Sequence, residues 1–179
     1  IFGAGAAAIA EGRVVTVQTL GGTGALKVGA DFLRRFAPGA QVWISDPSWE
    51  NHRALFEGAG FAVGTYPYYD ASTRGLDFSG MIGALESLAP GSIVVLHACC
   101  HNPTGVDPTP AQWTRIIDVV RARGLVPILD LAYQGFGSGV PLDHLRALAE
   151  LATDGLAPDL TILLDLPVER AWGKTQRTF

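Results

Sequence analysis

The residues best suited to bind a ligand follow apolar runs that are typical of strands. One group, Gly21-Gly22-Thr23-Gly24, stands between a predicted strand and a predicted helix. Backbone N–H groups at a helix start, together with the helix dipole, suit a phosphate. The stretch is not a P-loop, because Leu26 precedes Lys27 and Val28 follows it. A tight turn between strand and helix is the alternative interpretation.

A carboxylate stands at the end of another apolar run, residues 125–129. Burying Asp130 there is costly unless a cationic N–H group pairs with it. Tyr133 places a phenol near the same strand end. A helix cap or a surface ion pair remains an alternative for Asp130, and a packed ring with its hydroxyl in water remains one for Tyr133.

The loop after the predicted strand 41–45 carries an aromatic ring and an imidazole. Trp49 could stack on a planar ligand there, although a loop tryptophan that covers the core is at least as common. His52 could hydrogen-bond a carboxylate such as Asp130 and hold it. A lone histidine is more often structural, so His52 alone assigns no function.

The stretch His97–Gly105 follows a predicted buried parallel strand at residues 92–96. Its Asn102 therefore lies at a strand end, where open α/β sheets bind their ligands.

Four side chains nearby could ligate zinc: His97, Cys99, Cys100 and His101. Their spacing matches neither finger nor ribbon patterns and no second ligand pair exists, so no metal site is expected. Adjacent cysteines on a strand point to opposite faces, which disfavours a disulfide and fits a reduced cytoplasm.

The elements that must position these residues alternate along the chain. Strands are expected at 13–18, 41–45, 61–66, 92–96 and 125–129, and helices at 25–36, 51–59, 78–88 and 110–123. Asp77 and Thr109 are expected to cap the last two helices, with Pro110 at the first helical position and Gly124 beyond the end. This alternation predicts an α/β fold, a three-layer, mostly parallel sheet flanked by helices.

The composition of the chain argues against several kinds of binding partner and against a membrane span. The chain has 179 residues, of which 48% are hydrophobic and 17% charged, with a net charge of −4. Nothing basic is clustered, so nucleic acid and anionic membranes are not expected partners. No apolar run reaches the roughly 18 residues of a membrane span. The N-terminus lacks Met and a basic region, so we expect no signal peptide and a chain cut from something longer.

Taken together, these stretches resemble the large domain of class I aminotransferases, which are fold-type I enzymes that use pyridoxal 5'-phosphate. The resemblance is to the aspartate and aromatic amino acid branch. It follows the family's order and spacing to about Gly139. Its carriers are Val17–Leu26, Pro47–His52, Tyr68–Asp70, His97–Gly105 and Asp130–Phe136.

The resemblance implies a role for each candidate near the cofactor. Gly22 and Thr23 would hold the phosphate, and Trp49 would stack on the pyridine ring and line the substrate pocket. Asp130 would pair with the protonated ring nitrogen and keep the ring able to withdraw electrons from the substrate. His52 would support Asp130.

Two further residues would contact the ring's phenolic oxygen, namely Asn102 and Tyr133, and Asn102 would also reach the substrate carboxylate. His97, Cys99 and Cys100 would pack around the site without reacting. The implied activity is transamination between an aspartate-type or aromatic amino acid and a 2-oxo acid, in a cytoplasmic homodimer.

The lysine that bonds the cofactor as a Schiff base in this family has no counterpart, so no catalytic residue is assigned. The only lysines are Lys27, in the first predicted helix, and Lys174, in an unrelated context whose role stays open. The resemblance therefore implies a fragment that binds pyridoxal phosphate weakly and is inactive.

Two domains are expected, at 1–139 and 140–179. The tail from about Leu145 resembles a late segment of bacterial thymidylate kinases, without their phosphate-binding loop or catalytic Asp-Arg. A helix at 142–152 and a strand at 160–166 could extend the same sheet. An inactive hybrid αβ module with no ligand is the alternative function, and kinase-related nucleotide binding is placed last.

Overall fold

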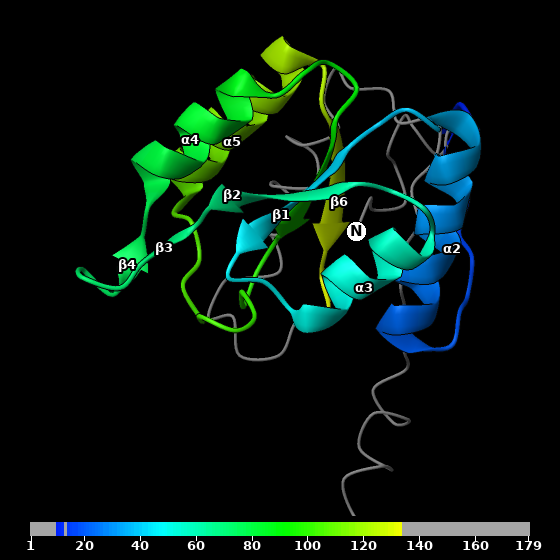
Figure 1. Cartoon of the computed structure of the whole chain (residues 1–179), viewed down its shortest axis with the longest axis horizontal. Helices are drawn as coiled ribbons and strands as arrows, with labels where there is room; N and C mark the ends of the chain where they lie inside the picture. The colour runs from blue at the N-terminus through cyan, green and yellow to red at the C-terminus, as the bar shows by residue number, and fades with distance from the viewer. Residues whose placement is uncertain (1–9, 13, 134–179) are drawn as a thin grey trace, which may run out of the picture.

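The computed structural model describes residues 10–12 and 14–133 (Figure 1). The predicted boundary at residue 139, the tail and Lys174 lie outside the described residues. The elements follow in the order α2 (Gly21–Phe36), β1 (Val42–Asp46), α3 (Glu50–Gly58), β2 (Val63–Pro67), β3 (Tyr69–Asp70), β4 (Gly75–Leu76), α4 (Phe78–Ser87), β5 (Ile93–His97), α5 (Pro110–Arg123) and β6 (Val126–Asp130).

Four strands form one parallel sheet in the order β2-β1-β5-β6. The β5–β6 register pairs residues from Ile93 with Val126 to His97 with Asp130, so the last two side chains are neighbours at the carboxyl edge. A separate antiparallel pair joins β3 to β4. The parallel sheet confirms the predicted α/β class.

Helices cover both faces of this sheet (Figure 1). Helices α2 and α3 pack together on one side, and α4 and α5 pack together on the other. Strand β5 contributes to both cores: Ile93 and Val95 join the cluster with α2 and α3, and Val94 and Leu96 join the cluster with α4 and α5. A strand buried on both faces must be apolar throughout, which explains its continuous hydrophobic run.

The predicted caps of α4 and α5 are confirmed. The Asp77 carboxylate accepts a hydrogen bond from the Gly80 backbone N–H at 2.9 Å. Thr109 Oγ1 accepts from the Gln112 N–H at 3.3 Å, and Gln112 Oε1 accepts from the Thr109 N–H at 2.8 Å. This reciprocal pair satisfies two N–H groups that have no partner inside the helix. Helix α5 ends at Gly124, whose φ of 60° suits glycine.

The predicted strand at 13–18 is wrong within its described part. Residues 14–18 form no strand, and Val15 and Val17 are 50% and 36% exposed. β-Branched residues favour a strand only where a neighbouring strand or a core receives them. Helix α2 begins at Gly21, earlier than the predicted residue 25, because its first residues are exposed and carry no apolar period. The short β3–β4 pair was not predicted.

Gly64→Ala is expected to lower the free energy of unfolding by about 1–3 kcal/mol, the usual cost of overpacking. Gly64 pairs with Trp43 across β1 and β2, and a Cβ on Gly64 would lie 2.7 Å from the Trp43 ring atom Cζ3. Urea unfolding followed by circular dichroism measures the change.

Gly83→Ala is the matched control. Gly83 is exposed in α4, and a Cβ there meets no atom within 4 Å. This variant should be neutral or more stable by up to about 1 kcal/mol, because alanine favours the helix. Equal destabilisation by both substitutions would contradict the packing argument.

Candidate functional site

The strand order creates a crevice at the carboxyl edge of the sheet, between β1 and β5. The chain leaves β1 through α3 on one face, and it leaves β5 toward α5 on the other face. The two loops diverge there, and open α/β sheets bind ligands at such a reversal of strand order. Figure 1 shows α2 and α3 beginning at the end of the sheet toward which the β6 arrow points. Side chains from several elements therefore meet at this edge.

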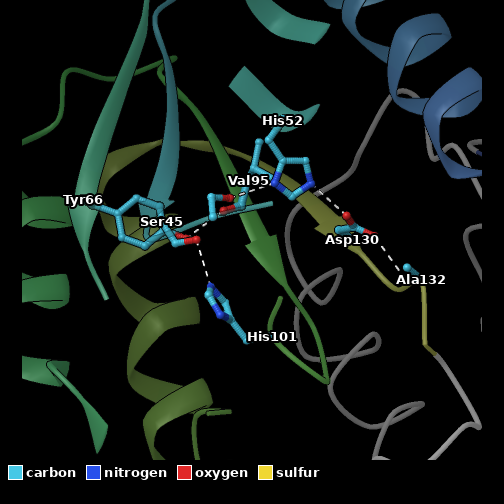
Figure 2. Close-up of polar contacts among 8 residues, drawn as sticks. Ser45, His52, Tyr66, Val95, His101, Asp130 and Ala132 are labelled. Atoms are coloured by element: carbon cyan, nitrogen blue, oxygen red, sulfur yellow. Dashed lines mark hydrogen bonds and ion pairs between the residues drawn. The ribbon is translucent and has the colours of Figure 1, made fainter. Parts of the chain in front are cut away.

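A buried histidine–aspartate pair lies at this edge of the sheet (Figure 2). His52 of α3 is fully buried, and its Nε2 lies 2.8 Å from Oδ2 of Asp130 at the tip of β6. This contact confirms the hydrogen bond expected between the two side chains. Since a carboxylate only accepts, Nε2 carries the proton, and Nδ1 accepts from the Ser48 hydroxyl at 2.9 Å. The other Asp130 oxygen, Oδ1, accepts from the Ala132 N–H at 3.2 Å.

These donors keep Asp130 ionised. Burial raises the pKa of Asp130, but the His52 hydrogen bond, the imidazoles of His52 and His97 and the Ala132 N–H together outweigh burial, so its pKa lies below the ordinary value. The site therefore holds a negative charge in a mostly dry environment, and each oxygen keeps a lone pair beyond the bonds already made.

The His97 side chain lies beside this pair, and none of the described residues hydrogen-bonds its ring. It is the β5 neighbour of Asp130, its ring centroid is 5.0 Å from that of His52, and it is 7% exposed. Both ring nitrogens are buried. Burial and the nearby His52 lower the pKa of His97 to about 4 against the opposing effect of Asp130 and Asp107. The imidazole is therefore neutral at neutral pH.

The loop after β5 is fixed by a second buried imidazole. Nε2 of His101 lies 2.9 Å from Ser45 Oγ, and its Nδ1 lies 2.8 Å from Thr104 Oγ1. The His101 ring stacks on Tyr68 with centroids 3.8 Å apart. Burial, and then the neighbouring His97 and His52, lower the pKa of His101 to about 3. Both ring nitrogens are thus used in holding the loop.

A single carboxylate fixes the backbone of the same loop. Asp107 Oδ2 accepts from the Cys100 N–H at 2.7 Å, and Oδ1 accepts from the His101 N–H at 2.8 Å. Cys100 has a φ of 52°, so the chain turns sharply here. Cys99 and Cys100 are both reduced. The next residue after His101 is Asn102, which is half-buried.

Among the other predicted residues, Trp49 contacts the His52–Asp130 pair. Trp49 precedes α3, is half-buried, and its ring is perpendicular to that of His52 with centroids 5.4 Å apart. Tyr133 is 44% exposed. The His52 backbone N–H donates to the Trp49 carbonyl at 2.9 Å. Among the described residues, no side-chain hydrogen bond joins Trp49, Asn102 or Tyr133 to the pair.

Gly22 and Thr23 are exposed in the first turn of α2. No side chain caps this turn, unlike the starts of α4 and α5, and it contains no acidic residue. A Cβ on Gly22 would meet no atom within 4 Å. The Gly21 N–H already donates to the Thr19 carbonyl at 3.0 Å, so the N–H groups of Gly22 and Thr23 are the ones left for an anion.

Three polar residues of this region were missed by the sequence reasoning, namely Ser45, Ser48 and Asp107. Ser48 stands four residues before His52, a spacing that places two side chains on one side of a helical turn and could have suggested the contact. Ser45 and Asp107 act on residues far along the chain or across a loop, where no local pattern predicts a partner.

No helix in the part of the chain that the structure describes is long and apolar enough to cross a membrane. A protein-family model described as aminotransferase class I and II matches residues 2–163. The chain is 55% identical over 151 residues to a tyrosine aminotransferase of Klebsiella pneumoniae, covering 83% of this chain and 38% of that protein. It is 57% identical over 157 residues to an aspartate aminotransferase of Pseudomonas aeruginosa, covering 88% and 39%.

Solved structures of aminotransferases also match this chain. An aromatic-amino-acid aminotransferase from Burkholderia pseudomallei, covalently bound to pyridoxal phosphate, superposes with a TM-score of 0.82 at 58% identity. The match covers 90% of this chain and 39% of that one. The chain thus spans about two fifths of the length of the relatives it matches.

Asp107→Ala is expected to lower the free energy of unfolding by about 2–3 kcal/mol, because two partly buried N–H groups lose a charged acceptor. Asp118→Ala, on the exposed side of α5, is the control and should stay within about 0.5 kcal/mol of the unaltered chain. Urea unfolding measures both. An Asp107 variant as stable as the control would show that the loop holds itself without this carboxylate.

Proposed function

The chain belongs to aminotransferase class I and II, and we propose that its described residues form part of a pyridoxal 5'-phosphate site. The full-length protein would transfer an amino group between an aspartate-type or aromatic amino acid and a 2-oxo acid. One observation carries the proposal: a buried, ionised carboxylate, Asp130, is held by His52 at the carboxyl edge of the sheet.

Asp130 suits the protonated nitrogen of a pyridine ring. Its pKa is lowered, so it remains an anion that can stabilise a cationic N–H group. The His52 and Ala132 donors fix the orientation of the carboxylate, and each oxygen can still accept one bond. When bound, pyridoxal phosphate supplies an electron sink for bond breaking at the substrate's α-carbon.

The start of α2 suits the phosphate. The first N–H groups of the helix have no capping side chain, and their dipole favours an anion. Gly22 leaves the backbone open on its Cβ side, so an oxygen can approach closely. We assign the phosphate to Gly22 and Thr23 on these grounds.

Three side chains complete the proposed site. Trp49 would stack on the ring, since its indole is half-buried beside His52. Asn102 and Tyr133 would donate hydrogen bonds to the ring's phenolic oxygen, and Asn102 would also bind the substrate carboxylate. The Asp107-bound loop limits the movement of Asn102 and so reduces the entropy lost on binding.

This chain would hold the cofactor without a covalent bond. Lys27 pairs with Asp31 on the exposed side of α2, and Lys174 does not match the family's lysine motif. We therefore propose binding without turnover for the 179-residue chain. The cytoplasmic location and the homodimer of the full-length protein rest on the family resemblance.

Asp130→Ala should weaken binding of pyridoxal phosphate by about 10- to 100-fold, the equivalent of one charge-assisted hydrogen bond. The change in absorbance and fluorescence on adding pyridoxal phosphate to the full chain measures this affinity. Asp46→Ala, an exposed aspartate at the tip of β1, and Lys174→Ala should leave the affinity unchanged. Borohydride should fix no cofactor to the chain.

Three other results of these binding experiments would count against the proposal or favour an alternative. No binding by the unaltered chain would favour the inactive αβ module. A borohydride-stable adduct lost in Lys174→Ala would overturn the non-covalent form of the proposal. Tight binding of a thymidine nucleotide instead would support the kinase-related alternative.

A further inference from the structure

We propose that His52, His97 and Asp130 form a binding site for a divalent transition-metal ion such as Zn²⁺. Such an ion would occupy the crevice when the pyridine ring is absent and would exclude that ring when bound. The metal site concerns the chain without its cofactor and does not depend on the function proposed above, whereas exclusion of the ring rests on that function.

The three ligand atoms are already grouped. One nitrogen from each histidine and one Asp130 oxygen all lie within 4.8 Å of one another, and all three residues are buried. Tetrahedral zinc with bonds of about 2.0–2.1 Å places its ligands roughly 3.3 Å apart. Forming the site would therefore require His52 and Asp130 to separate slightly from 2.8 Å and His97 to move inward.

His97 supplies the independent observation that points to a ligand. It is more than nine-tenths buried and adjoins Asp130 across β5 and β6, and within residues 10–12 and 14–133 neither ring nitrogen has a partner. A buried imidazole with two unsatisfied nitrogens is costly, because it has lost water and gained no hydrogen bond. A metal bond to one nitrogen would offset part of that cost.

The groups around the ligands suit a metal as well. A ligating histidine usually donates its other ring N–H to an oxygen. If Nε2 of His52 bound the ion, the proton would sit on Nδ1 and be donated to Ser48 Oγ, which already lies 2.9 Å away. The Ala132 N–H holds Asp130 Oδ1, which leaves Oδ2 for the ion. Two histidines, one carboxylate and a water would complete a four-coordinate site.

The alternative ligands nearby are less suitable. Both nitrogens of His101 are engaged, one with Ser45 and the other with Thr104. Binding an ion there would break a contact that holds the loop after β5. A thiolate site at Cys99 and Cys100 would lack that histidine, so the triad is the favoured location.

Titration of the tag-free, cofactor-free full chain with CoCl₂ and then ZnCl₂ tests the proposal. The unaltered chain should bind one Co²⁺ with visible d–d absorbance and without the intense thiolate-to-cobalt band, and Zn²⁺ should displace it. His97→Gln should weaken binding by roughly 100-fold or more, since loss of a supporting residue alone costs about 10- to 100-fold.

His101→Gln is the matched control and should keep the affinity within about 3-fold, well below the loss expected for a removed ligand. Circular dichroism establishes that each variant folds, and the cobalt spectrum of the unaltered chain tests the ligand set without any variant. No binding, a thiolate band, or equal loss in both histidine variants would overturn the proposal. Prior saturation with pyridoxal phosphate should block cobalt binding. If cobalt still binds to the saturated chain, that result argues against the proposed cofactor site and leaves the metal site supported.

Discussion

The structure depends on keeping one carboxylate charged at the buried end of a parallel sheet. Removing an isolated carboxylate from water costs several kcal/mol even after the protein relaxes, which is a large share of a domain's stability (about 5–15 kcal/mol). Asp130 avoids most of that penalty because His52 and the Ala132 backbone donate to it. The donors come from α3 and from the residue just beyond β6, so the pair also ties two elements of the sheet edge together.

Topology explains why these partners can meet. His52 and Asp130 are 78 residues apart in the chain. Strands β1 and β5 are neighbours, yet they lead into helices on opposite faces, so the crevice between their ends is not closed by a connection. The loop after β1 brings α3 and His52 to this edge. The β5–β6 register brings His97 beside Asp130.

The sequence was most informative where the physical cause is local. The caps at Asp77 and Thr109 depend on residues within one helical turn, and the polar residue at the end of an apolar run identified Asp130. The strand at 13–18 failed because β-branched composition does not show whether a neighbouring strand exists.

Long-range partners were harder to predict. The bond between His52 and Asp130 was reached only as a hypothesis about two strand ends. The contact between Ser45 and His101 was not reached at all, because the two residues are 56 positions apart and no local pattern pairs them. Asp107 caps backbone N–H groups six and seven residues before it, so its role appears only after the loop is closed. Burial of His97 without a partner likewise follows from packing and not from spacing.

The tautomer of His52 links the two ligands proposed for this crevice. A cationic ring N–H is stabilised when Asp130 stays an anion held by the Nε2–H of His52. A metal ion instead needs the lone pair on Nε2, with the proton moved to Nδ1. Ser48 can serve both states, because its hydroxyl donates to a bare Nδ1 and accepts from a protonated one. The two proposed ligands would therefore share Asp130 and would select different proton positions on His52.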